Sequence, residues 1–177
     1  MPPSEGVSVA EEGNRRKGPM TPAEIRQCVT DVVSWFSKRV EEEMVPATEA
    51  DLKALAEKLQ LPLALEELYA KTQGGIWFED KQLASPQAAS KLMGEIDLSA
   101  SRYYPFCNDE DEGLLVVDCD DEAVYEYDMT EGLGVKLAVS FADFLEQYRN
   151  LLLADHFDYV EEMGLVEKVL QHPPRGK

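Results

Sequence analysis

A run of short apolar segments between Arg102 and Tyr148 constrains the fold more than any other feature of the sequence. Each segment has the length of a β-strand, and Asp, Glu, Asn or Gly residues separate it from the next one. Strand-length apolar runs joined by such turn residues are typical of successive β-hairpins. Residues 114–117 are apolar on both faces of a strand, which predicts a central position in a sheet. We therefore expect an antiparallel meander in this part of the chain.

Helix signals precede and follow the meander. Thr21 and Thr48 are each followed by the Pro, Glu or Asp residues that occupy the first turn of a capped helix. Apolar residues then recur at helical spacing, which predicts helices from Thr21 to about Met44–Val45, from Thr48 to Leu59, from Leu61-Pro62 to Gly74 or Gly75, and from Ser85 to Met93. A short strand is expected at residues 76–78.

Two further helices are predicted after the meander. Ser140 caps the first, in which Phe141, Phe144 and Leu145 begin an apolar face that continues to Leu152. The second is expected near residues 157–171, with Gly164 as a weak point that costs about 1 kcal/mol relative to Ala. The order of helices, then strands, then helices predicts an α+β fold rather than alternating βαβ units.

The 177 residues are enough for one ordinary domain with its own hydrophobic core. Residues 1–20 are rich in Pro, Gly, Ser and Glu and have no apolar periodicity, so a disordered tail is expected there. We expect a single domain over residues 21–172 and a frayed C-terminus over residues 173–177. No internal repeat is visible in the sequence.

The charge of the chain restricts its partners. Its formal net charge is −18, which argues against nucleic acid and anionic membrane, because both attract basic surfaces. Neither a signal peptide nor an apolar run of membrane-spanning length is present, and three cysteines in no metal-binding pattern favour free thiols. The chain is therefore predicted to be cytoplasmic and to bind a protein. The charge permits a partner with a basic surface, and plain solubility is the simpler explanation of it.

Acidic residues concentrate in the two turns that flank the central strand. Eleven Asp and Glu residues, and no Lys or Arg, lie between Tyr103 and Val135. We single out as candidate partner-binding residues the acids Asp109, Glu110, Asp111, Glu112, Asp120, Asp121 and Glu122. A divalent-metal-dependent enzyme that uses the acids of residues 109–122 is the alternative, but these turns lack the spacing of a calcium loop. Solvated turns between strands are the simpler interpretation.

Catalytic and cofactor motifs are not found in the sequence. The two histidines, His156 and His172, stand near no Cys or Ser motif, and the chain has neither a nucleophile elbow nor a Gly-rich phosphate loop. We therefore predict no catalytic residue, no cofactor, no metal and no small-molecule ligand.

Two blocks of residues resemble the SUKH superfamily, in particular its Smi/Knr-type branch. The first is the helix from Thr48 to Leu59, followed by Leu61-Pro62 and a short helix that ends on Gly74-Gly75. The second joins an aromatic-Pro-Phe strand, an acidic turn, the apolar strand ending in Asp118, an aromatic strand, and a helix that begins Ser-Phe-x-x-Phe-Leu. The resemblance covers about residues 48–153. Gln73 stands where an Asn is usual before the Gly pair.

The resemblance implies an α+β domain in which helices pack against a curled antiparallel sheet of about four to six strands. It also implies a non-catalytic protein-interaction role, in a regulatory or scaffold subunit. Relatives include fungal regulators of cell-wall synthesis, bacterial immunity proteins that bind toxins, and a subunit of a tubulin-polyglutamylating complex. If the sheet is concave, Trp77 and Tyr104 are candidates to line a partner groove, because aromatic residues are frequent hot spots of interfaces.

Overall fold

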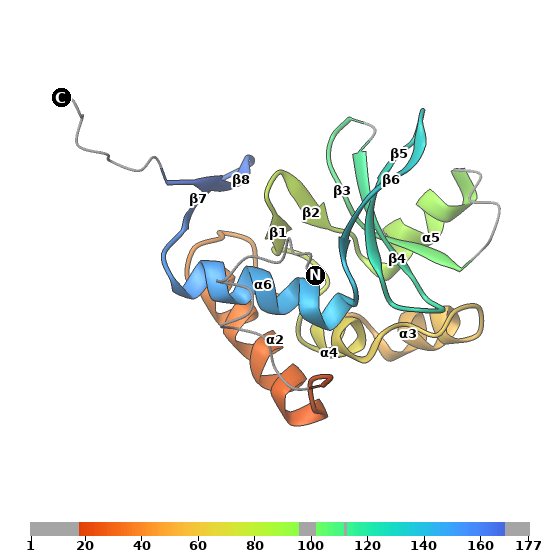
Figure 1. Ribbon diagram of the computed structural model, residues 1–177, viewed down its shortest axis with the longest axis horizontal. Coiled ribbons are helices and arrows are strands. Elements are labelled where there is room, and N and C mark those ends of the chain that lie inside the picture. Colours follow the sequence, from red (N-terminus) through yellow and green to blue (C-terminus); the bar gives the residue numbers. More distant parts are fainter. Residues whose placement is uncertain (1–17, 96–101, 112, 169–177) are drawn as a thin grey trace, which may run out of the picture.

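The computed structural model of the chain describes residues 18–95, 102–111 and 113–168. Most of the tail predicted over residues 1–20, and all of the C-terminus predicted to fray at 173–177, lie outside these residues. The described residues form an α+β fold in which helices surround a curled antiparallel sheet (Figure 1). The fold class predicted from the sequence is therefore confirmed.

Six strands form the main sheet of the described residues, in the order of the chain: β1 Trp77–Phe78, β2 Lys81–Leu83, β3 Tyr103–Asn108, β4 Gly113–Asp118, β5 Val124–Asp128 and β6 Gly132–Ala138. Every neighbouring pair is antiparallel. The predicted meander is thus confirmed from β3 to β6, and β4 is a central strand. The sequence did not predict β2, because it is short and two of its three residues are polar.

Helices cover both faces of the sheet. On one face, α4 (Leu63–Lys71) and α6 (Phe141–Leu153) share a hydrophobic cluster with Leu115 and Val117 of β4, and α2 (Pro22–Ser37) packs on α4 and α6. On the other face, α5 (Pro86–Glu95) places Leu92 against Leu114 and Val116, and α3 (Glu49–Ala56) lies beside it. Alternate residues of β4 therefore enter two separate clusters, as expected of a strand that is buried on both sides.

The helix starts lie where their caps predict. Thr21 and Glu24 form a reciprocal capping box at α2. The hydroxyl of Thr48 accepts a hydrogen bond from the amide of Asp51 in α3, and that of Ser140 accepts one from the amide of Asp143 in α6. The predicted end of α2 is wrong, because the helix stops at Ser37 rather than near Met44. The Arg39 guanidinium donates to the carbonyl oxygen of Trp35 at 2.8 Å, which satisfies a carbonyl of the last turn.

The predicted last helix is also wrong. Residues 157–167 form a β-hairpin of β7 (Phe157–Val160) and β8 (Gly164–Glu167), and residues 169–171 lie outside the described residues. Phe157 and Leu165 are buried, whereas Asp158 and Glu167 are exposed. Burial alternates along β7, where Phe157 faces inward and Asp158 outward, but it does not alternate along β8, so the apolar spacing of this segment gives no clear strand signal and also suits a helix.

The β7–β8 hairpin sits against the β1 edge of the main sheet. The amide of Leu165 donates to the carbonyl oxygen of Glu79 at 3.0 Å, and the ring of Tyr159 lies 6.4 Å from that of Trp77, centroid to centroid. Gly164 has φ +92°, and a Cβ at this position would overlap the carbonyl oxygen of Glu79 and the Trp77 ring. Gly164 is thus required by close packing and is not the weak point of a helix.

Candidate functional site

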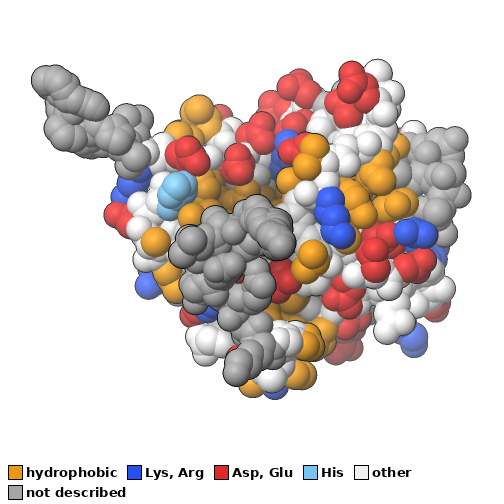
Figure 2. All heavy atoms as spheres, in the orientation of Figure 1, with side chains coloured by type: hydrophobic (Ala, Val, Ile, Leu, Met, Phe, Trp, Pro, Cys, Tyr) orange, Lys and Arg blue, Asp and Glu red, His pale blue; other side chains and the backbone are white. Residues whose placement is uncertain are grey.

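The antiparallel order of the sheet brings two acidic turns to the same end of the molecule. The β3–β4 turn at residues 109–112 and the β5–β6 turn at residues 129–131 both lie where β4 begins. We call this surface the acidic sheet end, and it consists of Asp109, Glu110, Asp111, Glu126, Asp128 and Glu131. Glu112, a predicted site residue, lies outside the described residues. Figure 2 shows acidic side chains gathered over this part of the sheet.

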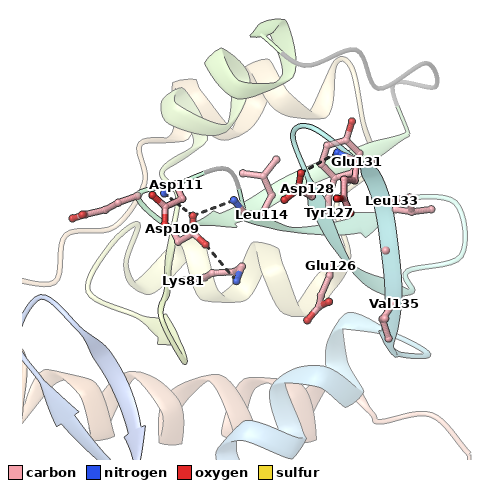
Figure 3. Close-up of a pocket in the computed structure, with 14 residues that line it drawn as sticks. Lys81, Asp109, Asp111, Leu114, Glu126, Tyr127, Asp128, Glu131, Leu133 and Val135 are labelled. Atoms are coloured by element: carbon pink, nitrogen blue, oxygen red, sulfur yellow. Dashed lines mark hydrogen bonds and ion pairs between the residues drawn. The ribbon is translucent and has the colours of Figure 1, made fainter.

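The acidic sheet end surrounds an open pocket of about 890 Å³. Asp109 and Asp111 lie on one side of this pocket and Asp128 and Glu131 on the other (Figure 3). Apolar side chains of the strands, among them Leu133, also line it. The pocket is therefore a shallow surface with an acidic rim, which suits a side chain or a segment of another protein better than an enclosed ligand.

Two acids of this surface hold the turns in place. Oδ1 of Asp109 accepts hydrogen bonds from the amides of Asp111 at 2.8 Å and Gly113 at 3.1 Å. Oδ1 of Asp128 accepts from the amides of Thr130 at 2.8 Å and Glu131 at 2.9 Å. Asp side chains commonly stabilise turns in this way. Asp109 and Asp128 therefore shape the surface, while Glu110, Asp111, Glu126 and Glu131 are exposed on it.

Among the described residues that line the pocket, Lys81 is the one basic side chain. Its ammonium lies 3.5 Å from Oδ2 of Asp109 and 3.4 Å from Oδ1 of Asp80. Burial lowers the pKa of Lys81, but these two carboxylates outweigh the effect of burial and raise its pKa overall. Lys81 thus stays charged and offsets part of the negative charge of the surface, at the β2 side only.

The other acidic turn lies at the opposite end of β4. This strand has six residues, so at about 3.3 Å per residue its two ends are roughly 17 Å apart. Asp120, Asp121 and Glu122 are exposed there, as is expected of a solvated turn. The two predicted acidic patches are therefore separate, and their carboxylates cannot share one metal ion.

Asp118 differs from the rest of its turn, and the expectation that it is solvated is wrong. Its side chain is 1% exposed, forms an ion pair with Arg102, and accepts a hydrogen bond from the amide of Asp120 at 2.9 Å. Burial raises the pKa of Asp118, but the Arg102 guanidinium and the turn amides lower it by more, so its net pKa is below the usual range. Asp118 is a structural residue of the turn.

The two candidate aromatic residues occupy different environments. Tyr104 is fully buried, and its hydroxyl lies 2.7 Å from that of Tyr69, which donates to the carbonyl oxygen of Ala84 at 2.6 Å. Tyr104 therefore cannot line a partner groove, and this prediction is wrong. Trp77 of β1 is half-buried against the β7–β8 hairpin, where it packs on Tyr159.

The described residues contain no cluster of side chains suited to binding a metal ion. No three His, Cys, Asp or Glu side chains of that part of the chain lie close enough together to hold one metal ion. Nε2 of the exposed His156 lies 3.2 Å from Oε2 of Glu167. Among the described residues, Cys28, Cys107 and Cys119 form no disulfide bond. Within the same residues, no helix has the length and apolar character needed to cross a bilayer.

Sequence reasoning missed half of the acidic sheet end. It selected the acids of residues 109–112 but not Glu126, Asp128 and Glu131, which belong to the next hairpin. The signal was available, because in an antiparallel meander every second turn lies at the same end of the sheet. Pairing of Gly113 with Asp128 and of Leu115 with Glu126 places these side chains beside the β3–β4 turn.

Comparisons with known proteins identify a family for the central part of the chain. Residues 46–147 match the family model described as SMI1 / KNR4 family (SUKH-1). A search of curated proteins finds no match. The matched residues contain α3, α4, α5, the six-stranded sheet and the first half of α6, whereas α2 and the β7–β8 hairpin lie outside them.

Proposed function

The chain belongs to the SMI1 / KNR4 family (SUKH-1), and from this premise we propose that it is a non-catalytic protein-interaction module. It binds a partner with a basic surface through the acidic sheet end, as a regulatory or scaffold subunit in the cytoplasm. The observation that carries this proposal is the convergence of two acidic turns and Glu126 around one open pocket with a single lysine.

Electrostatics supports a basic protein as the partner. Several carboxylates on a common surface create a negative field that attracts a basic surface of another protein. Such steering raises association rates by about 10–1000-fold at low salt. The formal charge of −18 adds a long-range component to this field. Because single exposed ion pairs contribute only about 0–1 kcal/mol each, several carboxylates must act together.

The arrangement of the acids supports this proposal over the metal-dependent enzyme. A metal site needs several carboxylates that converge on one ion. The turn acids instead lie in two groups at opposite ends of β4, and Asp109 and Asp128 already accept hydrogen bonds from backbone amides. Calorimetric titration with Mg²⁺, Mn²⁺ and Ca²⁺ tests the alternative, since tight stoichiometric binding of any of them would favour it.

The proposal is tested with two matched triple variants. The surface variant carries Glu110→Gln, Glu126→Gln and Glu131→Gln, and the control variant carries Glu41→Gln, Glu43→Gln and Glu57→Gln. All six side chains are exposed, and both variants change the net charge equally. Asp109 and Asp128 are left intact because they hold the turns.

Immobilised parent and variants would be exposed to a cell extract at low and high salt, and the retained proteins would be identified by mass spectrometry. We expect the parent and the control variant to retain the same basic protein, the surface variant to lose it, and high salt to release it. Retention of one partner by all three proteins would contradict the proposal. Failure of the parent to retain any basic protein would contradict it as well.

A further inference from the structure

The two edges of the main sheet differ in whether another described element covers them. The β1 edge is covered by the β7–β8 hairpin, which bonds to Glu79 and packs on Trp77. The β6 edge pairs only with β5 among the described residues. A strand at an open edge presents backbone N–H and C=O groups that another strand can pair with. Within the part of the chain that the structure describes, one edge of this sheet is therefore covered and the other pairs with no further strand.

The open edge also exposes apolar side chains. Leu133 is 45% exposed, Val135 is 62% exposed and Val139, just beyond β6, is 65% exposed. Lys136 and the register shifts with β5 are the features of β6 that oppose pairing with a further strand, and the rest of the strand is uncharged and contains no proline. A largely apolar strand with one free edge of this kind is a template for β-strand addition.

Acidic side chains flank the open edge at both ends. Glu131 precedes β6 and Glu126 lies on the neighbouring strand, within the acidic sheet end. At the far end of β6, Glu122 lines the same surface groove as Val139. A strand that pairs with β6 would therefore meet negative charge at both of its ends, with Lys136 between them, which favours lysine or arginine at the ends of that strand.

We propose that β6 binds an extended basic segment of the partner, which joins the main sheet as a further antiparallel or parallel strand. This inference rests on the proposed function and specifies how the partner is held. Apolar residues of the segment contact Leu133 and Val135, and its basic residues lie near Glu122, Glu126 and Glu131. The register shifts between β5 and β6 bend the edge, so the added strand is short.

A second copy of this chain is a less suitable occupant than a basic segment. Pairing of β6 with β6 of another copy would bring two chains of formal charge −18 together. It would also place the Glu126 and Glu131 side chains of both copies near one shared edge. Like charges in such contacts are destabilising, so charge complementarity selects a partner of the opposite sign.

The test uses a heptapeptide of alternating valine and lysine as the probe, with binding measured by fluorescence anisotropy. Two N-methylated forms keep its side chains and charge, and each blocks the backbone N–H groups along one edge. Strand addition requires one edge of the peptide only, so we expect methylation of one edge to weaken binding about tenfold or more and methylation of the other to have little effect. Hydrogen exchange of β6 amides should slow when the peptide binds.

Two matched protein variants locate the site. Val135→Ser should weaken binding of the unmethylated peptide, whereas Val160→Ser on the exposed side of β7 should not. Equal binding of all three peptides, with strong salt dependence, would overturn strand addition and leave the acidic sheet end as the binding surface. Absence of binding would also overturn strand addition, while partner capture tests the proposed function separately. A dimer of the protein alone that Val135→Ser dissociates would show that a second copy occupies the edge.

Discussion

Two buried hydroxyls form a hydrogen-bond chain between α4 and β3. Tyr69 donates to Ala84, so the proton between the two tyrosines belongs to Tyr104. Burial raises the pKa of Tyr69 well above its ordinary range, and burial raises that of Tyr104 as well. Both hydroxyls therefore stay neutral and serve to satisfy polar groups inside the core.

Tyr69→Phe should destabilise the fold more than Tyr104→Phe. The first change leaves the carbonyl of Ala84 and the hydroxyl of Tyr104 without their buried partner, which costs about 1–3 kcal/mol. The second change removes one hydrogen bond but leaves the bond from Tyr69 to Ala84, and should cost about 0.5–1.5 kcal/mol. Urea unfolding of both variants measures the difference, and the reverse order would show that the proton chain runs differently.

The buried Asp118 carboxylate should contribute to the loss of folding stability at acidic pH. Its folded pKa lies below the unfolded value, so its contribution to stability is complete above the unfolded pKa and is lost as the pH falls through the folded pKa. The loss should therefore begin near pH 5 and grow below about pH 4, given an unfolded pKa of about 3.9.

Urea unfolding at a series of pH values measures this effect. Asp118→Asn should lower the free energy of unfolding at pH 7, and that free energy should then fall less steeply than in the parent between about pH 5 and pH 2. Asp111→Asn, at an exposed turn position, is the control and should behave like the parent. Parallel curves for the parent and Asp118→Asn would mean that Asp118 makes no such contribution.

Residue roles within the acidic turns could not be predicted from the sequence. Asp118 and Asp120 are both turn acids two positions apart, but only Asp118 is buried against Arg102. Similarly, Asp109 holds its turn while Glu110 beside it is exposed. These differences depend on the direction of each side chain and on partners that are distant in the sequence. Composition and spacing therefore identify an acidic turn, but they do not show which of its acids are buried and which are exposed.

At the scale of elements, local signals predicted the starts of helices correctly. Thr21, Thr48 and Ser140 cap helices with hydrogen bonds inside one turn, and such contacts can be inferred from adjacent residues. The β7–β8 hairpin has no such local determinant. Phe157 stacks on Tyr148 with ring centroids 6.0 Å apart, and Leu165 bonds to Glu79, so tertiary contacts decide its conformation. The apolar spacing alone favoured the wrong element.

Gly164→Ala should be the more damaging of two matched glycine substitutions. Gly164 and Gly132 have nearly equal φ values of +92° and +93°, but a Cβ at Gly132 meets nothing within 4 Å. Gly132→Ala should therefore cost only about 1–2 kcal/mol of backbone strain. Gly164→Ala adds overlap with Glu79 and Trp77, which raises the expected cost to about 2–5 kcal/mol.

Urea unfolding of both glycine variants separates strain from overlap. A larger loss for Gly164→Ala would support the close contact of the hairpin with the β1 edge. Equal losses would show that the hairpin can move away from β1 without a further cost. In that case the β1 edge would be less firmly closed than the hydrogen bond from Leu165 to Glu79 indicates.

At the scale of the whole molecule, the elements within the family match and those outside it occupy separate parts of the structure. The family match includes the sheet and the helices α3, α4 and α5, while α2 and the β7–β8 hairpin are added outside it. The hairpin covers the β1 edge, and α2 packs on α4 and α6. Among the described residues, no further strand pairs with β6, and Glu110, Asp111, Glu126 and Glu131 of the acidic sheet end are exposed. The two surfaces proposed for binding therefore belong to the family core and not to the additions.

The sequence predicted the meander and its acidic turns, and the order of strands determines how those turns combine. Asp111 and Glu131 are 20 positions apart in the chain, but both line one pocket. The meander connectivity implies this proximity once all its strands are assigned. The curl of the sheet and the exposure of β6 depend on the packing of all layers, so they could not be derived from the pattern of residues.

Association kinetics of the captured basic partner test the central claim most directly. Rate constants would be measured for the parent, for the surface variant with Glu110, Glu126 and Glu131 changed to Gln, and for the control variant with Glu41, Glu43 and Glu57 changed to Gln. We predict that the surface variant associates more slowly at low salt and with a weaker salt dependence, while the control variant follows the parent more closely. Identical association of all three proteins at every salt concentration would contradict binding through the acidic sheet end.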